Sequence, residues 1–205
     1  VNQYLYDMKR AGEVYNAGRG WYSSIPHMFL PSRESVEHMA SAIKDKYPLL
    51  SFSVWSTEQL QPFAHHVMTR FIRFVYVDFD AMPSIVDSLK DLGYHAHLNP
   101  QKREAEKHLD SSSNAVVVRA SITREPLEGF YATAEKILVD LFMERDRLSL
   151  MDTAEYQRVF RNLVLAYRIN IARLLEYAER RKVRTAILRD VLKSEHDVFL
   201  FDERP

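Results

Sequence analysis

The chain has 205 residues, of which 46% are apolar and 12% aromatic, so it can bury a substantial core. It contains no cysteine, which excludes a disulfide framework and a thiolate metal site. No apolar run is long enough for a transmembrane helix, and no signal-peptide pattern opens the chain. These features fit a cytoplasmic protein without a membrane partner. Because the first residue is valine, we expect the sequence to be a fragment, a processed chain or part of a longer protein.

Formal charges cancel over the whole chain, with 28 basic and 28 acidic side chains, but their distribution is uneven. Residues 155–193 carry ten basic and four acidic side chains, a net charge of +6. Residues 25–154 and 194–205 are net acidic, at −4 and −3, and residues 1–24 are at +1. A basic block on helices is often only a solvated face, but it also suits an anionic partner, either nucleic acid or an acidic protein.

The segment Asn2 to Ser24 predicts one helix followed by a short hairpin. Leu5 and Met8 share an apolar helix face, and Gly12 stands where a helix C′ glycine is expected. Two strand-like pieces, residues 13–15 and 21–23, flank the turn NAGRG, whose glycines permit positive φ. A recognition helix followed by a β-wing is the last half of a winged helix-turn-helix. The one or two helices that precede it in that motif are not in this sequence.

The polar face of this helix and the hairpin tip supply candidate DNA contacts. Long polar side chains suit base edges, and basic ones suit phosphates. We expect base-edge contacts from Asn2, Gln3 and Tyr6, and phosphate contacts from Lys9, Arg10 and Arg19.

Alternating helical and strand patterns follow, and they predict a small mixed sheet. Apolar periodicity and β-rich runs assign the elements in chain order. We expect helices at 32–47, 57–66, 80–92 and 101–109 (the last a helix or loop), and strands at 49–55, 70–79, 94–98 and 115–120. Thr57 is the expected N-cap of the second helix, and Asp80 that of the third.

Beyond Tyr131 the patterns are helical only, with helices expected at 131–144, 152–167, 170–181 and 183–193. The apolar stripe from Tyr156 to Tyr167 should face the core. Basic side chains would then form a surface for a second anionic partner; they are Arg158, Arg161, Arg168, Arg173, Arg180, Arg181, Lys182, Arg184 and Arg189. The fold class predicted is α+β: a truncated winged helix-turn-helix (1–24), then a mixed α/β domain ending in a helical bundle (25–205).

Catalytic and metal-binding patterns find little support. Asp78 and Asp80 end a strong strand, as metal-holding carboxylates do in nucleases and nucleotidyltransferases, but no Gly-Ser precedes them and no third carboxylate follows in a buried strand. Adjacent His65 and His66 point apart, whereas His95 and His97 share a strand face, but the sequence has no cysteine and no HExxH spacing to support a metal site. A glycine-rich phosphate loop is also missing. We therefore expect no enzyme activity, no metal and no cofactor.

Several segments together resemble AbiEi-type antitoxins, the repressor half of type IV AbiE toxin–antitoxin systems. The helix, Gly12, GRG and aromatic-Tyr phrase is similar to the family's winged helix. Residues 47–66, with Tyr47-Pro48, VWST and His65-His66, and the helix AEKILVDLF at 134–142 resemble its larger domain. The similarity runs in order over most of residues 4–180. By itself, each buried-type segment is also explained as core.

The resemblance implies a DNA-binding transcriptional repressor and antitoxin. It would bind operator repeats, autoregulate its operon and counteract a nucleotidyltransferase toxin encoded beside it, in a phage-defence setting. The alternatives are a non-catalytic protein-interaction domain with a winged-helix remnant, or a metal-dependent nuclease or nucleotidyltransferase using Asp78 and Asp80.

Overall fold

The structure is a computed structural model, and it describes residues 2–65, 71–109, 114–191 and 199–201. Its helices are α1 (Asn2–Ala11), α2 (Glu34–Lys46), α3 (Met82–Asp91), α4 (Lys102–His108), α5 (Ala134–Arg147), α6 (Thr153–Ala166), α7 (Ile171–Arg180) and α8 (Arg184–Asp190), with 3₁₀ turns η1 (Thr57–Phe63) and η2 (Phe79–Ala81). Its strands are β1 (Tyr15–Asn16), β2 (Trp21–Ser23), β3 (Phe52–Ser56), β4 (Arg73–Val77), β5 (His95–Leu98), β6 (Ala115–Ala120), β7 (Leu127–Glu128), β8 (Tyr131–Ala132) and β9 (Phe199–Phe201). The α+β class predicted from the sequence is confirmed.

A six-stranded mixed sheet in the order β5-β6-β4-β3-β8-β7 forms the centre of the body. Strands β5, β6 and β4 are parallel to one another, and β3 is antiparallel to β4. The crossovers α3 and α4 run in opposite directions along the sheet and therefore cover opposite faces.

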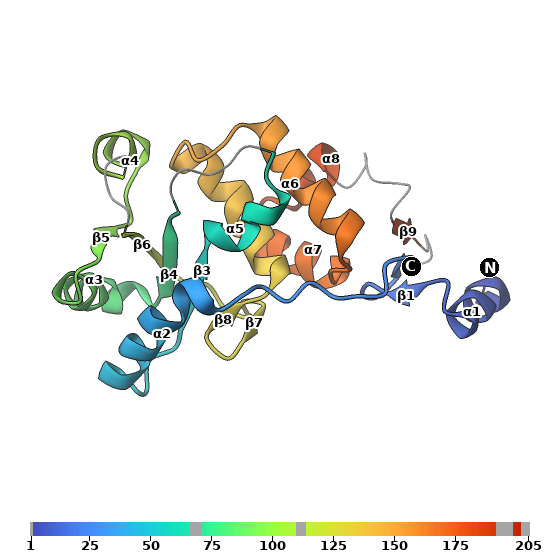
Figure 1. Cartoon of the computed structure of the whole chain (residues 1–205), viewed down its shortest axis with the longest axis horizontal. Helices are drawn as coiled ribbons and strands as arrows, with labels where there is room; N and C mark the ends of the chain where they lie inside the picture. Colours follow the sequence, from blue (N-terminus) through green and yellow to red (C-terminus); the bar gives the residue numbers. More distant parts are fainter. Residues whose placement is uncertain (1, 66–70, 110–113, 192–198, 202–205) are drawn as a thin grey trace.

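The two faces of the sheet bury different cores, because side chains alternate along each strand. On β4, Phe74 and Tyr76 pack towards the C-terminal helices, whereas Val75 and Val77 pack towards α2 and α3. The result is three layers, with α2 and α3 on one side and α5, α6 and α7 on the other (Figure 1). As expected, Trp55 lies in the core, where its ring stacks on Phe74 at 4.3 Å.

A second, three-stranded antiparallel sheet in the order β1-β2-β9 lies at one end of the molecule, beside α1 (Figure 1). Strand β9 comes from the C-terminal tail, for which the sequence predicted no strand. It pairs with the hairpin in the register Trp21↔Phe201 and Ser23↔Phe199. A tail segment therefore completes the sheet that the N-terminal hairpin begins.

Several predicted boundaries are wrong at the ends of elements. Ser56, not Thr57, is the N-cap of η1: its Oγ accepts a hydrogen bond from the Glu58 N–H. Asp80 does not cap α3: it lies inside η2, and α3 begins at Met82 with a proline in its first turn. Helix α5 begins at Ala134 rather than Tyr131, because the residues before it form the β7–β8 hairpin around Gly129, which has a φ of 65°.

The C-terminal helices pack largely as their periodicity predicted. Five apolar side chains of α6 are fully buried: Tyr156, Val159, Phe160, Leu163 and Val164. Tyr167, the last residue of the predicted stripe, is 37% exposed, although its ring contacts Phe29 and Phe63. Within the described residues, no helix is long and apolar enough to cross a bilayer.

Candidate functional site

Helix α1 presents most of the predicted DNA-contact residues on one exposed face. Gln3, Tyr6 and Arg10 lie at helical spacing and are exposed, while Leu5 and Met8 on the other face are half-buried. The amide of Gln3 donates to Asp7 at 3.0 Å, and the ammonium of Lys9 lies 4.4 Å above the Tyr22 ring. Asn2 belongs to α1, but its side chain lies outside the described part. Gly12 ends the helix with a positive φ of 74°, as the sequence predicted.

The hairpin turn is docked on the body through one side. The carbonyl of Ala17 accepts from the Ile171 N–H at 2.7 Å, at the start of α7. Gly18 has a φ of +109°, and a Cβ there would lie 2.4 Å from the Asn170 Oδ1. Only glycine therefore fits the contact. Arg19, the next residue, remains exposed at the tip, so the turn holds the body with one residue and presents a cation with the next.

Arg181 does not belong to the predicted basic surface. Its side chain is only 9% exposed, and its guanidinium lies 3.2 Å from the buried carboxylate of Asp140. Arg173 and Arg180 stay partly exposed, but they donate to the backbone carbonyls of Leu127 (3.4 Å) and Arg124 (2.6 Å). These arginines hold the loop before α5 against α7, so part of the +6 charge has a structural use.

Most of the remaining basic block is engaged within the chain. Three of its four acids form short contacts with its own arginines: Arg158–Glu155 (3.2 Å), Arg184–Glu179 (3.6 Å) and Arg189–Asp190 (2.6 Å). Hydrogen bonding to Asp190 raises the pKa of Arg189, and the same contact lowers the pKa of that carboxyl. The guanidinium of Arg168 lies 5.1 Å from the Tyr15 ring centroid, between hairpin and body. Arg161 and Lys182 are exposed. Each of these ion pairs is neutral overall, so the net positive charge of residues 155–193 comes from the excess of basic over acidic side chains.

Asp78 and Asp80 are both exposed beyond the carboxyl end of β4. Asp78 accepts a hydrogen bond from the Ser121 hydroxyl, which follows the neighbouring parallel strand β6. Asp78 and Ser121 line an open pocket of about 660 Å³ that Lys44 and Arg124 also border. Glu125 also lines this pocket, so two carboxylates there are balanced by two basic groups and the lining has no excess of acidic side chains.

The predicted histidine candidates are spread over distant elements. His95 and His97 lie on the edge strand β5, and His65 follows η1 with its backbone N–H donating to Glu155. His66 lies outside the described residues. Among the residues that the structure describes, no group of three or more His, Asp or Glu side chains could hold a metal ion.

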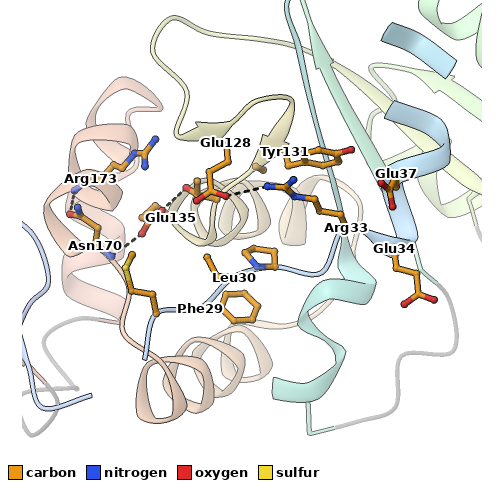
Figure 2. A pocket seen from close by; sticks show the side chains of 14 residues that line it. Phe29, Leu30, Arg33, Glu34, Glu37, Glu128, Tyr131, Glu135, Asn170 and Arg173 are labelled. Atoms are coloured by element: carbon orange, nitrogen blue, oxygen red, sulfur yellow. Dashed lines mark hydrogen bonds and ion pairs between the residues drawn. The ribbon is translucent and has the colours of Figure 1, made fainter. Parts of the chain in front are cut away.

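A second pocket, of about 530 Å³, was not anticipated from the sequence (Figure 2). It forms where the connector 28–31 crosses the N-terminal ends of α5 and α7 and the β7–β8 hairpin. Within it, Arg33 lies 3.3 Å from Glu128 and stacks over the Tyr131 ring at 4.5 Å. The sequence did not predict the pocket, because its walls come from three separate segments of the chain, residues 28–37, 128–135 and 170–173. The two-proline connector and the Asn170 cap were the available signals.

Comparison with known proteins places the chain in a family without assigning an activity. Residues 1–197 match the family described as "Family of unknown function (DUF6577)". The chain belongs to this family. No curated protein matches the chain. No solved structure matches it either. The DUF6577 match covers α1, the β1–β2 hairpin and the six-stranded sheet. It therefore includes both the predicted DNA-contact face and the pocket in Figure 2.

Proposed function

We propose that this protein is a DNA-binding transcriptional repressor and antitoxin of an AbiE-like type IV toxin–antitoxin system, acting in the cytoplasm. The observation that supports the proposal is the exposed polar face of α1, set beside a hairpin with an exposed Arg19 at its tip. The antitoxin half, directed against a nucleotidyltransferase toxin, rests on the sequence resemblance. No catalysis, metal or cofactor is part of the proposal.

The physical case is one of shape and charge. A helix fits the major groove, and its exposed amide and hydroxyl groups can reach base edges. Lys9 and Arg10 lie in the last turn of α1, where they can meet phosphates that flank the groove. In a winged helix the hairpin follows the backbone next to the groove, which is the position proposed for Arg19. Net charge here is modest, so few phosphate contacts are expected and the affinity should be moderate.

The decisive experiment measures the salt dependence of DNA binding by the full-length protein. Fluorescence anisotropy would follow binding to repeat-containing DNA from upstream of its own operon. Arg19→Ala should weaken binding to all sequences and lower the slope of log K against log salt by about 0.9. Arg103→Ala, an exposed arginine on α4 at the opposite end of the molecule, is the matched control and should leave the slope unchanged. An equal slope for Arg19→Ala and the control would remove Arg19 from the interface.

The outward-facing part of the basic block gives a second test. Lys182→Glu with Arg184→Glu reverses two exposed charges without touching the buried Arg181. If the block extends the DNA footprint, the slope of log K against log salt should fall by the amount expected for two lost phosphate contacts, about 1.8. If it serves the toxin or the toxin's nucleic-acid substrate, operator binding persists while rescue of toxin-expressing cells fails. No change in either assay would leave the block as a solvated face.

One observation favours the alternative of a protein-interaction module. Tyr4 and Tyr6 on α1 are 67% and 59% exposed, and exposed tyrosines are common in protein interfaces. Absence of DNA binding by the full-length protein at low salt, together with loss of toxin neutralisation in Tyr4→Ala and Tyr6→Ala, would favour that alternative.

A further inference from the structure

The pocket in Figure 2 has an apolar wall and a polar floor. Met28 and Leu30 of the connector border it and are 52% and 69% exposed, an unusual exposure for large apolar side chains. Phe29 and Tyr131 add aromatic surface. A volume of about 530 Å³ lies within the range that small organic ligands occupy.

The floor of the pocket is formed by a carboxylate of the protein, that of Glu135. Glu135 is only 4% exposed, and its carboxylate accepts from the Asn170 N–H at 2.8 Å and from the Thr133 hydroxyl. It lies where the N-terminal ends of α5 and α7 meet, and such ends attract negative charge. A second anion bound there would be repelled by Glu135.

The remaining charges also favour a positive ligand. Four carboxylates line the pocket (Glu34, Glu37, Glu128 and Glu135) against two guanidinium groups (Arg33 and Arg173). Arg33 is paired with Glu128, and Arg173 donates to a backbone carbonyl. Within the described residues Glu135 has hydrogen-bond donors but no ion pair. A buried carboxylate in this state gains most from a cation brought beside it.

We propose that this pocket binds a small organic cation, with an ammonium or guanidinium group against Glu135 and an apolar body against Met28, Phe29 and Leu30. This inference stands apart from the proposed function, because the pocket shares no residue with the DNA-contact face. The ligand would stabilise the crossing of connector and helices that forms the site.

The same crossing also holds the N-terminal region to the body. Backbone hydrogen bonds join Arg168 to His27 (2.7 Å) and to Phe29 (3.1 Å), and Ile171 to Ala17 of the hairpin (2.7 Å). Asn170 lies between Arg168 and Ile171 in the sequence: its backbone N–H donates to Glu135, and its side chain fills the space beside Gly18. Occupancy of the pocket should therefore also change how firmly the hairpin is held, and a change in DNA affinity on occupancy rests on the proposed function.

The test uses calorimetric titration of the whole chain with 2-phenylethylamine as the probe, without DNA. 2-Phenylethanol and phenylacetate are neutral and anionic matches. The amine should bind at least about tenfold more tightly than the alcohol, and phenylacetate should not bind, since charge-assisted hydrogen bonds are the strong ones. Glu135→Gln should weaken amine binding about tenfold or more, whereas Glu176→Gln, exposed on α7 outside the pocket, should not.

A second variant guards against misfolding of Glu135→Gln. Leu30→Ala removes an exposed apolar wall group, so it should fold normally and weaken the amine several-fold. Equal amine binding by wild type and Glu135→Gln, preference for phenylacetate, or no binding of the amine at 10 mM, about the weakest affinity the titration resolves, would each overturn the proposal. Amine binding by a chain that binds no DNA would uphold the pocket while refuting the repressor.

Discussion

The two faces of the central sheet solve the same packing problem with different chemistry. The face under α2 and α3 is filled by aliphatic side chains such as Val75, Ile85 and Leu89, all with no exposed surface. The face under α5 and α7 carries charge: beside the side chains of Glu125 and Arg181, which are 5% and 9% exposed, it buries six charged residues of β6 and α5. Those residues are Arg119, Glu135, Lys136, Asp140, Glu144 and Arg145.

Four of these six charges form two buried ion pairs, Arg119 with Glu144 and Lys136 with Asp140. Arg119 donates to Glu144 through Nη2 at 2.6 Å and Nε at 3.1 Å, and its Nη1 donates to the Asn99 side chain and the Pro100 carbonyl, both at 2.8 Å. Lys136 lies 2.7 Å from Asp140 and 3.2 Å from Glu125, with its ammonium 3.7 Å from the Tyr76 ring centroid.

The lesson of the comparison concerns where each kind of core gains its stability. The aliphatic face is stabilised by buried apolar area and close packing, so the stability lost on truncating a side chain there should follow the volume of the cavity left behind. The charged face gains little net energy from its pairs, yet removing one partner strands another charge in a medium that cannot solvate it. The second face should therefore be more sensitive to single changes and more sensitive to pH.

The largest expected effect is that of Asp140→Ala. Asp140 accepts from Lys136 and from the Tyr177 hydroxyl at 2.9 Å, and it lies 3.2 Å from the Arg181 guanidinium. Its loss leaves Arg181 without this anion and leaves Lys136 with Glu125 alone. We expect the free energy of unfolding to fall by about 3–5 kcal/mol, measured by urea denaturation. Asp87→Ala on the exposed face of α3 should change stability by no more than about 0.5 kcal/mol. A loss under about 1 kcal/mol at Asp140 would show that the network is hydrated and contradict the comparison.

On the aliphatic face, Leu89→Ala tests the volume rule. The side chain is fully buried in the α2/α3 core, and its truncation should cost about 2–5 kcal/mol. The loss should be the same at pH 7 and pH 10, because the buried side chains of this cluster are apolar and do not titrate. A marked pH dependence of that loss would mean that the two cores are coupled through the sheet.

Alkaline pH should destabilise the charged face selectively. Burial raises the pKa values of Tyr76, Tyr156 and Tyr177, and the carboxylate of Asp140 raises those of Tyr76 and Tyr177 further. In the unfolded chain these phenols ionise near pH 10 while the folded ones stay protonated, so stability is full below pH 10 and falls above it. Each tyrosine should contribute a loss of about 1.4 kcal/mol by pH 11. Thermal unfolding from pH 8 to 11 should show a shallower decline in Tyr156→Phe than in the exposed-site control Tyr4→Phe.

The sequence predicted the aliphatic core better than the charged one. Apolar spacing in α5 identified Ala134, Ile137, Leu138 and Leu141, but the same periodicity assigns Lys136, Asp140 and Glu144 to solvent. These three are buried because their partners arrive from other elements: Arg119 on β6, Glu125 in a loop, and Tyr177 and Arg181 at the end of α7. A single helix's pattern contains no record of such long-range pairs.

The candidate sites divide in the same way. The exposed face of α1 and the Arg19 tip follow from local spacing and glycine placement, so the sequence could predict them. Strand β9 and the pocket around Glu135 depend on segments that meet only in the folded chain. Arg181 was misassigned for the same reason, since nothing near it in the sequence reveals Asp140 as its partner.

The smallest expected effect compares two identical changes within the charged face. The Tyr177 hydroxyl accepts from Lys136 at 3.0 Å and donates to Asp140 at 2.9 Å, whereas the buried Tyr76 hydroxyl has no hydrogen-bond partner among the described residues. Tyr177→Phe should therefore cost about 1–3 kcal/mol by breaking a bridge between buried charges. Tyr76→Phe should be neutral or stabilising, within about 1 kcal/mol, because it removes a buried hydroxyl that makes no bond and keeps the ring beneath the Lys136 ammonium. Urea denaturation of both variants decides the matter, and a larger loss for Tyr76→Phe would place an ordered water on that hydroxyl.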